Sequence, residues 1–298
     1  MNIWVIRPGA LGDTILTIPL LYAIKDKYPT ARITLLGSRP YQDILPNEFD
    51  FIAVDNRDSV WLFEAYHKTT TLKTKPCDMA YVILRNPDIV ISNLRHVGVH
   101  EIISASPIPF PNFHLIETLH IQLGFPIPPR RPILENSRSD HTENICWIHP
   151  GSGGTKKLAP LKLFRAISNA IKNKTGCKIV ITLGEADSHL KKLEYWRLLL
   201  QESHAELIEN RPLKEICNHL ARAKYFIGND SGISHLAAQL GILSVLFFVN
   251  SDPVQWSPWT NPNQVLIVNC RNRILNEDMC THVEEEIKIS LGTILASK

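Results

Sequence analysis

A strand, a tight polar turn and a helix follow one another near residue 230, and this stretch constrains the fold of the chain most. Residues 223–227 are apolar enough for a buried strand, and residues 236–240 have the spacing of an amphipathic helix that Gly241 ends. Between them lies the sequence Gly-Asn-Asp-Ser-Gly-Ile-Ser-His, residues 228–235. This order predicts one unit of an open α/β sheet, a fold that binds ligands at the carboxyl ends of its strands.

The turn itself has the features of an anion site. We expect Asp230 or Ser231 to cap the helix, and Gly232 has no Cβ, so a ligand can approach its backbone closely. The free N–H groups of the first helical turn and the positive end of the helix dipole attract an anion such as a pyrophosphate. His235 follows on the same side of the helix as Ser231. Taken alone, the Asp-Ser-Gly sequence favours an ordinary capping turn, and the anion site is preferred only because other stretches of the chain agree with it.

The same pattern opens the chain. An apolar strand at residues 3–6 is followed by Arg-Pro-Gly-Ala-Leu-Gly-Asp at residues 7–13 and then by a helical pattern. Gly9 and Gly12 do not fit the G-x-G-x-x-G spacing of dinucleotide sites, which argues against a nicotinamide-dependent enzyme. Asp13 falls in the first helical turn, where it either balances the helix dipole or serves as a general base at the strand end.

The rest of the first half continues the alternation of strands and helices. Strands are predicted at residues 31–37, 51–55, 79–84 and 100–104, and helices at residues 58–70, 88–95 and 112–123. Four arginines fall near strand ends or in loops: Arg7, Arg39, Arg85 and Arg95. They either line a pocket for a phosphorylated acceptor or are solvated surface charges. The proline-rich stretch at residues 126–132 predicts a linker between two domains.

The second half restarts with a strand at residues 144–148 and the loop His-Pro-Gly-Ser-Gly-Gly-Thr-Lys-Lys, residues 149–157. Such a loop offers N–H groups to a phosphate, and Lys157 adds a point charge, although the P-loop pattern is absent. A flexible interdomain loop is the alternative. Glu185 and Asp187 follow the next strand, where a carboxylate can bind ribose hydroxyls or cap a helix. The remaining predicted elements are a strand at residues 178–183, helices at residues 161–172, 188–201 and 213–222, a last clear strand at residues 244–249, and a helical tail from residue 284.

Composition excludes several classes of protein. A net charge of +3 over 298 residues, without a basic run that alternates with aromatic residues, gives no support for a nucleic-acid partner. The six cysteines show no C-x-x-C spacing, which argues against a zinc site and a disulfide framework and fits a reducing compartment. No stretch approaches about 18 apolar residues, so neither a membrane span nor a signal peptide is predicted.

Taken together, three motifs resemble glycosyltransferase family 9, the lipopolysaccharide heptosyltransferases, over almost the whole chain. They are Gly-Ala-Leu-Gly-Asp at residues 9–13, His-Pro-Gly-Ser at residues 149–152 with Lys157 and Pro160, and Gly-Asn-Asp-Ser-Gly at residues 228–232 with His235. The chain departs from the family in having Ala159 where a tryptophan usually precedes the proline. It also looks shorter than typical members, mostly in the first half, which bears on the acceptor.

The resemblance implies an α/β protein of the GT-B fold, with two Rossmann-like domains facing across a cleft. Residues 1–130 would bind the acceptor, and residues 131–298 would bind a nucleotide-sugar, with the C-terminal helix packing back on the first domain. The implied reaction is inverting, metal-independent transfer of a heptose or related sugar from an ADP-sugar to a lipopolysaccharide core, without a cofactor.

The resemblance also assigns roles to residues. Asp13 would be the general base, and Arg7, Gly9 and Gly12 would lie at the acceptor. The implied donor-binding residues are Ser152, Gly153, Lys157, Glu185 or Asp187, Asp230, Ser231, Gly232 and His235.

Two other functions stay open at this point. One is a GT-B transferase that uses another nucleotide-sugar, and the other is a nucleotide-sugar-binding protein without turnover, which would not need Asp13. The expected location is the cytoplasm. Because the acceptor is a glycolipid, we expect at most peripheral contact with the inner face of the cytoplasmic membrane.

Overall fold

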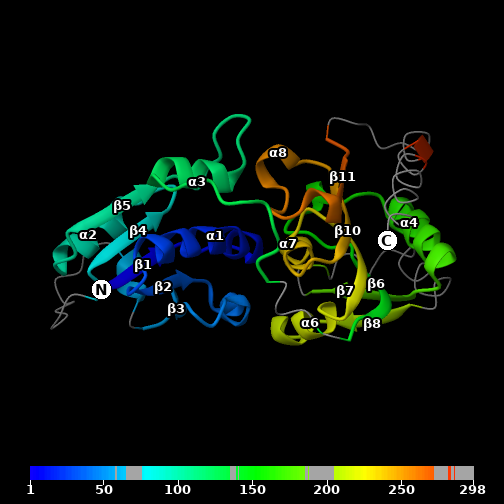
Figure 1. Cartoon of the computed structure of the whole chain (residues 1–298), viewed down its shortest axis with the longest axis horizontal. Coiled ribbons are helices and arrows are strands. Elements are labelled where there is room, and N and C mark those ends of the chain that lie inside the picture. Colours follow the sequence, from blue (N-terminus) through cyan, green and yellow to red (C-terminus); the bar gives the residue numbers. More distant parts are fainter. Residues whose placement is uncertain are drawn as a thin grey trace. The chain divides into compact units, whose positions relative to one another are not determined.

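The chain divides into two compact units, Met1–Pro129 and Arg130–Lys298, and the division lies inside the proline-rich stretch at residues 126–132 (Figure 1). The computed structural model describes residues 1–57, 59–64, 76–134, 139, 141–184, 187, 205–271, 281–282 and 285. No helix in this described part combines the length and the apolar character that crossing a membrane requires.

The first unit is built on a five-stranded sheet in the order β3-β2-β1-β4-β5, and every neighbouring pair is parallel. The strand order reverses at β1, so the carboxyl end of β1 is the place where an open α/β sheet binds ligands. The strands are β1 (Asn2–Ile6), β2 (Arg32–Gly37), β3 (Asp50–Ala53), β4 (Met79–Ile83) and β5 (Glu101–Ala105).

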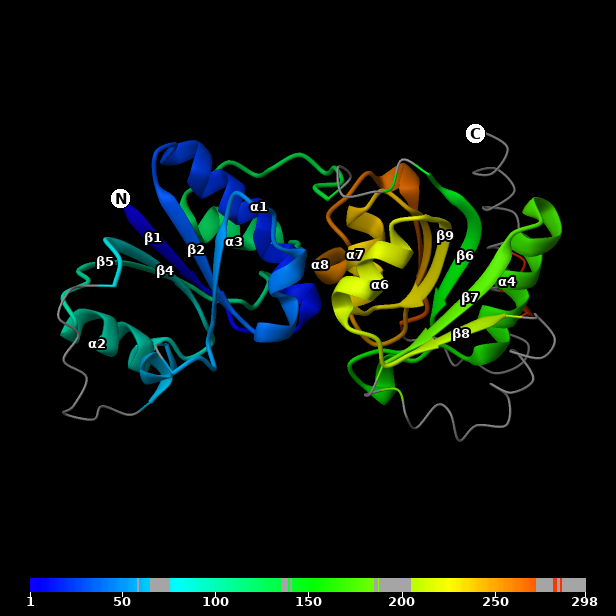
Figure 2. The same cartoon turned by 90° about the horizontal axis from the view of Figure 1, so that it is seen from below.

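Helices cover both faces of this sheet. Figure 2 shows α1 (Leu11–Lys27) and α3 (Leu115–Leu123) on one face and α2 (Asp88–His96) on the other. Short 3-10 helices are formed by η1 (Arg39–Ile44) and η2 (Val60–Phe63). Side chains of β1 alternate between the two apolar layers, and the layer under α2 contains Trp4, Ile6, Val82, Val90 and Leu94.

Two helix predictions in this unit need correction. The helix predicted at residues 112–123 begins at Leu115, because Asn112 has a φ of 63° and His114 is the N-cap that accepts the N–H of Ile116. Of the helix predicted at residues 58–70, the described part forms only the 3-10 turn η2, and residues 65–70 lie outside the described residues.

The second unit is a six-stranded parallel sheet in the order β11-β10-β9-β6-β7-β8. The order reverses between β6 and β9, so the loops that follow these two strands meet at one place at the edge of the sheet. The strands are β6 (Glu143–His149), β7 (Lys178–Leu183), β8 (Glu206–Glu209), β9 (Ala223–Asn229), β10 (Leu243–Phe248) and β11 (Val265–Asn269).

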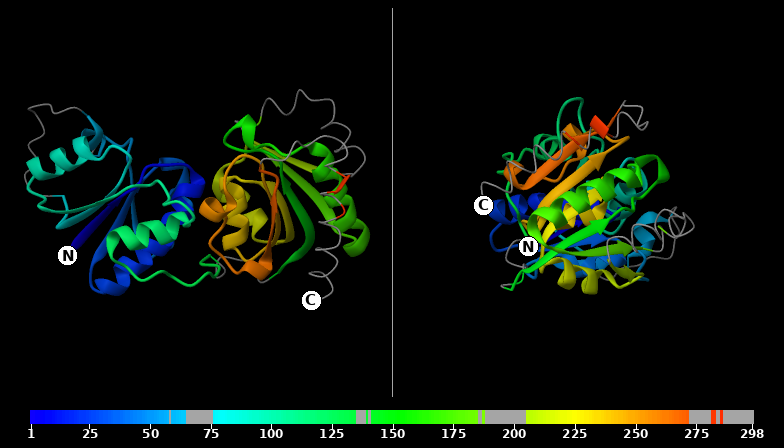
Figure 3. Two further views of the ribbon diagram at one scale, coloured as in Figure 1. Left: turned by 90° about the horizontal axis from the view of Figure 1, so that it is seen from above. Right: turned by 90° about the vertical axis from the view of Figure 1, so that its right-hand side faces the viewer.

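Helices again lie on both faces of the sheet. Figures 2 and 3 show α4 (Leu161–Thr175) on one face and α6 (Leu213–Leu220) and α7 (Gly232–Gln239) on the other. Under α4, Phe164 packs edge-on against Phe247 with ring centroids 5.1 Å apart. The shorter elements are α8 (Pro253–Trp256), η4 (Thr155–Lys157) and η7 (Pro262–Gln264).

Two parallel sheets with helices on both faces confirm the predicted α/β class. The prediction of a last clear strand at residues 244–249 is wrong, because β11 follows it, and the edge strand β8 was also missed. The helix predicted to end at residue 172 continues to Thr175, where Gly176 ends it in a left-handed conformation. The helix predicted at residues 188–201 and, apart from residue 285, the tail from residue 284 lie outside the described residues.

Candidate active site

Asp13 lies in the first turn of α1, directly after the carboxyl end of β1. Its Oδ1 accepts a hydrogen bond from Arg7 Nη2 at 2.7 Å, and its Oδ2 accepts the N–H of Ala10 at 3.0 Å. The carboxylate therefore has a fixed orientation, and it also pairs with one of the free N–H groups at the helix start. Its side chain remains 30% exposed, which leaves one side of the carboxylate accessible to a ligand.

The loop around Asp13 is built to hold that carboxylate. The Arg7 side chain is buried, and this burial lowers the pKa of its guanidinium, an effect that the charge of Asp13 opposes. At Gly9 an added Cβ would lie 2.7 Å from Asp13 Oδ2, so only glycine leaves room for the carboxylate to fold over the loop. The Ser38 hydroxyl donates to the Gly9 carbonyl at 2.8 Å and ties the loop to the end of β2. Gly12 is the second residue of α1.

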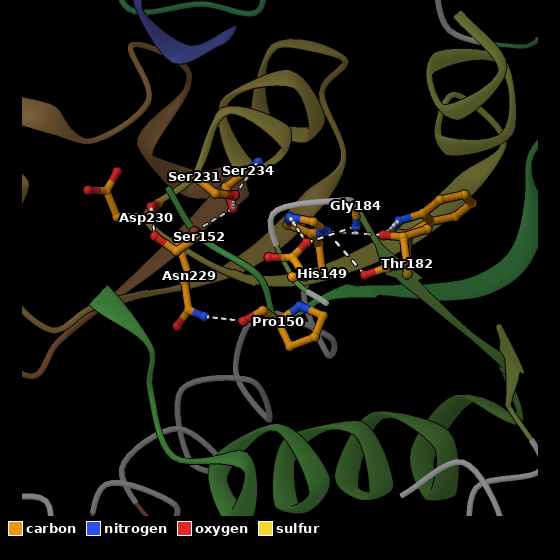
Figure 4. A network of polar contacts seen from close by, with 11 residues as sticks. His149, Pro150, Ser152, Thr182, Gly184, Asn229, Asp230, Ser231 and Ser234 are labelled. Carbon is orange, nitrogen blue, oxygen red and sulfur yellow. Dashed lines mark hydrogen bonds and ion pairs between the residues drawn. The ribbon is translucent and has the colours of Figure 1, made fainter. Parts of the chain in front are cut away.

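The second and third motifs meet in the second unit, where the loop after β6 and the turn after β9 lie side by side (Figure 4). Lys157 Nζ lies 2.6 Å from Asp230 Oδ2, and the Ser152 hydroxyl donates to the Asp230 carbonyl at 3.2 Å. The Asp230 side chain is only 6% exposed, whereas that of Lys157 is 37% exposed. The pair thus joins a buried anion to a cation that solvent can reach.

Ser231, and not Asp230, caps the helix that follows. Its hydroxyl oxygen accepts the N–H of Ser234 at 3.3 Å, while the Ser234 hydroxyl donates to the Asn229 carbonyl at 2.5 Å. Gly232 is the first residue of α7. The buried side chain of His235 places Nε2 3.9 Å from Asp230 Oδ1. The start of α7 and Lys157 therefore both present positive potential beside Asp230.

Asn229 holds the loop after β6 at both of its ends, a role that the sequence did not reveal. Its side-chain amide donates to the Pro150 carbonyl at 2.7 Å and accepts the N–H of Ala159 at 3.0 Å. The residue is 0% exposed, and both contacts are buried. The available signal was a polar amide that directly continues a buried strand, a place where an unpaired amide is costly.

Asp187 supports the same loop from the other side. Its Oδ2 accepts the N–H of Gly184 at 2.8 Å and lies 4.0 Å from His149 Nε2. Burial lowers the pKa of His149, whose Nδ1 lies 3.2 Å from both the carbonyl and the hydroxyl of Thr182 (Figure 4). A Cβ at Gly151 would overlap the Asp187 carboxylate. Asp187 is thus buried and engaged with its own loop, while Glu185 lies outside the described residues.

The structure brings together most of the predicted donor-binding residues. Gly153 has open space around its Cα on the side where a side chain would project.

Among the arginines of the first unit, Arg39 forms an exposed ion pair with Asp55 at 3.1 Å, as a surface charge would. The charge of Arg85 contributes to the lowered pKa of Arg7, so it lies near the Asp13 loop. In the described part of the chain, no group of three or more His, Cys, Asp or Glu side chains is arranged to hold a metal ion.

Comparison with known proteins identifies the family. A model described as glycosyltransferase family 9 (heptosyltransferase) matches residues 125–285, which is more than half of the chain. The chain belongs to glycosyltransferase family 9. This confirms the family that the three motifs indicated, and it makes the protein a glycosyltransferase.

Relatives of this family 9 protein span nearly its whole length. A lipooligosaccharide heptosyltransferase 2 of Campylobacter jejuni is 25% identical over 286 residues, which cover 90% of this chain and 86% of the relative. A glycosyl transferase family 9 structure from Veillonella parvula has a TM-score of 0.73 at 16% identity and covers 100% of this chain and 97% of its own. An E. coli heptosyltransferase solved with ADP has a TM-score of 0.68 at 13% identity and covers 97% and 99%. At these identities the structures show the fold, and they confirm the GT-B class.

Proposed function

We propose that this protein transfers a heptose or a related sugar from an ADP-sugar to a lipopolysaccharide or lipooligosaccharide core, with inversion at the anomeric carbon. The observation that carries the proposal is the meeting of Lys157, Asp230 and the start of α7 at the switch point of the second sheet. A relative named lipooligosaccharide heptosyltransferase 2 and a family structure solved with ADP support the acceptor and the nucleotide.

The second unit supplies the electrostatics for the leaving group. As the bond between the anomeric carbon and the diphosphate oxygen breaks, negative charge develops on the departing ADP. Lys157 and the N–H groups at the start of α7 are suited to stabilise that charge, an effect that often dominates catalysis. We assign Ser152, Gly153, Ser231, Gly232 and His235 to the same donor site.

The first unit supplies the base. Asp13 takes the proton of an acceptor hydroxyl while the hydroxyl oxygen forms the new bond to the anomeric carbon. Its fixed orientation and its partial exposure suit this role. Arg7 is buried and donates to Asp13, so we assign it to holding the carboxylate of the base in a fixed orientation. Gly9 and Gly12 leave space for the carboxylate and the acceptor.

Several finer assignments complete the proposal. We assign the acceptor to Met1–Pro129 and the nucleotide-sugar to Arg130–Lys298. Glu185 remains the proposed ribose ligand, whereas the buried contacts of Asp187 suit a role in holding the loop. We propose that the reaction needs no cofactor. It takes place on the cytoplasmic side, with peripheral contact with the membrane that contains the glycolipid.

Nucleotide binding tests the donor. We expect ADP to raise the melting temperature in a thermal-shift panel of ADP, UDP, GDP and NAD. Stabilisation by UDP in place of ADP would instead favour a GT-B transferase with another nucleotide-sugar, and NAD alone would contradict the proposal.

Turnover tests the base. We expect Asp13→Asn to lower sugar transfer on the order of 100-fold or more while ADP still binds, because the proton acceptor is lost and the donor site is not. Asp26→Asn, an exposed acid near the other end of α1, is the matched control and should transfer sugar normally. Equal activity of wild type and Asp13→Asn would remove Asp13 as the base. No transfer by either protein, with ADP bound, would favour a binding protein without turnover.

A further inference from the structure

Ser251 makes a contact that none of the three motifs includes. It lies after β10 and directly before Asp252, the N-cap of α8. Its hydroxyl donates to Asp230 Oδ2, the same oxygen that lies 2.6 Å from Lys157 Nζ. One carboxylate oxygen therefore receives two donors from two different loops.

The burial of Asp230 explains why this second donor matters. A carboxylate that is 6% exposed is costly unless charged or hydrogen-bonding groups surround it. Lys157 and Ser251 satisfy Oδ2, and His235 Nε2 lies 3.9 Å from Oδ1. Lys157 has the long flexible side chain, which is 37% exposed, whereas the His235 side chain is 6% exposed.

The geometry points to Ser251 as a positioning residue for the diphosphate of the donor, acting through Asp230 and Lys157. To contact a diphosphate at the start of α7, the Lys157 ammonium has to weaken or leave its pair with Asp230. Asp230 then stays buried with fewer partners, and the Ser251 hydroxyl lowers the cost of that exchange. This inference rests on the proposed function, because it takes a nucleoside diphosphate as the ligand.

Removing the hydroxyl should therefore hold Lys157 more firmly on Asp230. We expect Ser251→Ala, in the full chain, to weaken ADP binding about tenfold in isothermal titration calorimetry, which corresponds to the lower end of what a hydrogen bond to a charged group contributes. Ser251→Thr keeps the hydroxyl and should restore the affinity. Ser251→Cys keeps the size with a weak donor and should lie between them, which provides a second variant if the alanine protein folds poorly.

A double-mutant cycle separates this mechanism from a general disturbance of the loop. Lys157→Met should itself weaken ADP binding, and adding Ser251→Ala should then change the affinity little, because the effect passes through Lys157. Asp252→Asn, which changes the next residue but retains a side chain that can cap α8, is the matched control and should bind ADP as wild type does.

Each outcome has a separate meaning. Wild-type affinity in Ser251→Ala would overturn the positioning role and leave the proposed function intact. An equal loss in the wild-type and the Lys157→Met backgrounds would also overturn it, because Ser251 would then act independently of Lys157. If wild type bound no nucleoside diphosphate at all, the proposed function and this inference would both be wrong.

Discussion

Asn229 provides the sharpest test of how the loop after β6 is held. In Asn229→Ala the loop loses the bonds at both of its ends, and the Pro150 carbonyl and the Ala159 N–H are left unpaired in a buried place. Each buried orphan group costs about 1–3 kcal/mol, so two of them should lower the free energy of unfolding by about 2–6 kcal/mol. The midpoint, about 4 kcal/mol, is a large part of the stability of a typical domain.

The assay has to report on the second unit by itself, because two units need not unfold in one transition. Hydrogen exchange of peptides from β6 and β9, followed by mass spectrometry over a urea series, gives the unfolding free energy of this unit. The matched control is Asn144→Ala, since Asn144 is exposed and its amide makes one bond, to the Thr175 carbonyl at 2.8 Å. We expect this control to cost less than about 1 kcal/mol.

The comparison of the two asparagines decides the matter. If Asn229→Ala destabilised the unit no more than Asn144→Ala, the buried contacts of Asn229 would not hold the loop, and the reasoning would be refuted. If the large effect is found, ADP affinity should fall as well, because the loop that Asn229 anchors also presents Lys157.

Three further predictions follow from the same contacts. Gly151→Ala should lower the melting temperature, because its Cβ would overlap Asp187, whereas Gly153→Ala should not, because no described atom lies within 4 Å of its Cβ position. Arg7→Met should reduce turnover without changing ADP affinity, because it releases Asp13. Arg39 forms an exposed ion pair with Asp55, so Arg39→Met is the control variant in the same transfer assay. Burial lowers the pKa of His149 and His120, so the folded protein keeps them neutral at pH values where the unfolded chain already binds a proton. Their contribution to stability is complete above about pH 6.5 and is lost as the pH falls through that value toward the lower folded-state pKa. The urea midpoint of unfolding should therefore fall when the pH is lowered from about 7.5 to about 5.5, and it should fall less in His149→Gln than in wild type.

Apolar runs made most of the fold predictable. Strands with continuous apolar sequence, such as β4 and β10, were found because both of their faces are buried in a parallel sheet. The two missed strands, β8 and β11, both lie at the edges of the second sheet. In β8 two glutamates flank two aliphatic residues, so its apolar run is too short to indicate a strand. In β11 the aliphatic run at residues 265–268 is long enough, and the prediction left out this signal.

The helix caps are places where the sequence contained a signal that the predictions did not use. The helix was predicted from residue 112, whereas the three-residue spacing of His114 and Glu117 belongs to a capping box that sets the helix start at Leu115. At the turn after β9, both Asp230 and Ser231 are good caps by residue type. Ser231 takes the position because Lys157 and Ser251 already engage the Asp230 carboxylate, and no local pattern could reveal those distant contacts.

In the candidate site, too, the motifs predict which loops meet, whereas the contacts between distant residues could not be predicted. Parallel topology brings the loops after β6 and β9 to one edge of the sheet, so the motifs were expected to meet there. What the motifs do not show is that Lys157 and Ser251 both contact the buried Asp230 carboxylate. Under the proposed function, a donor diphosphate therefore competes with the Asp230 carboxylate for Lys157. We expect donor affinity to depend on the groups that stabilise Asp230 as much as on those that contact the phosphates.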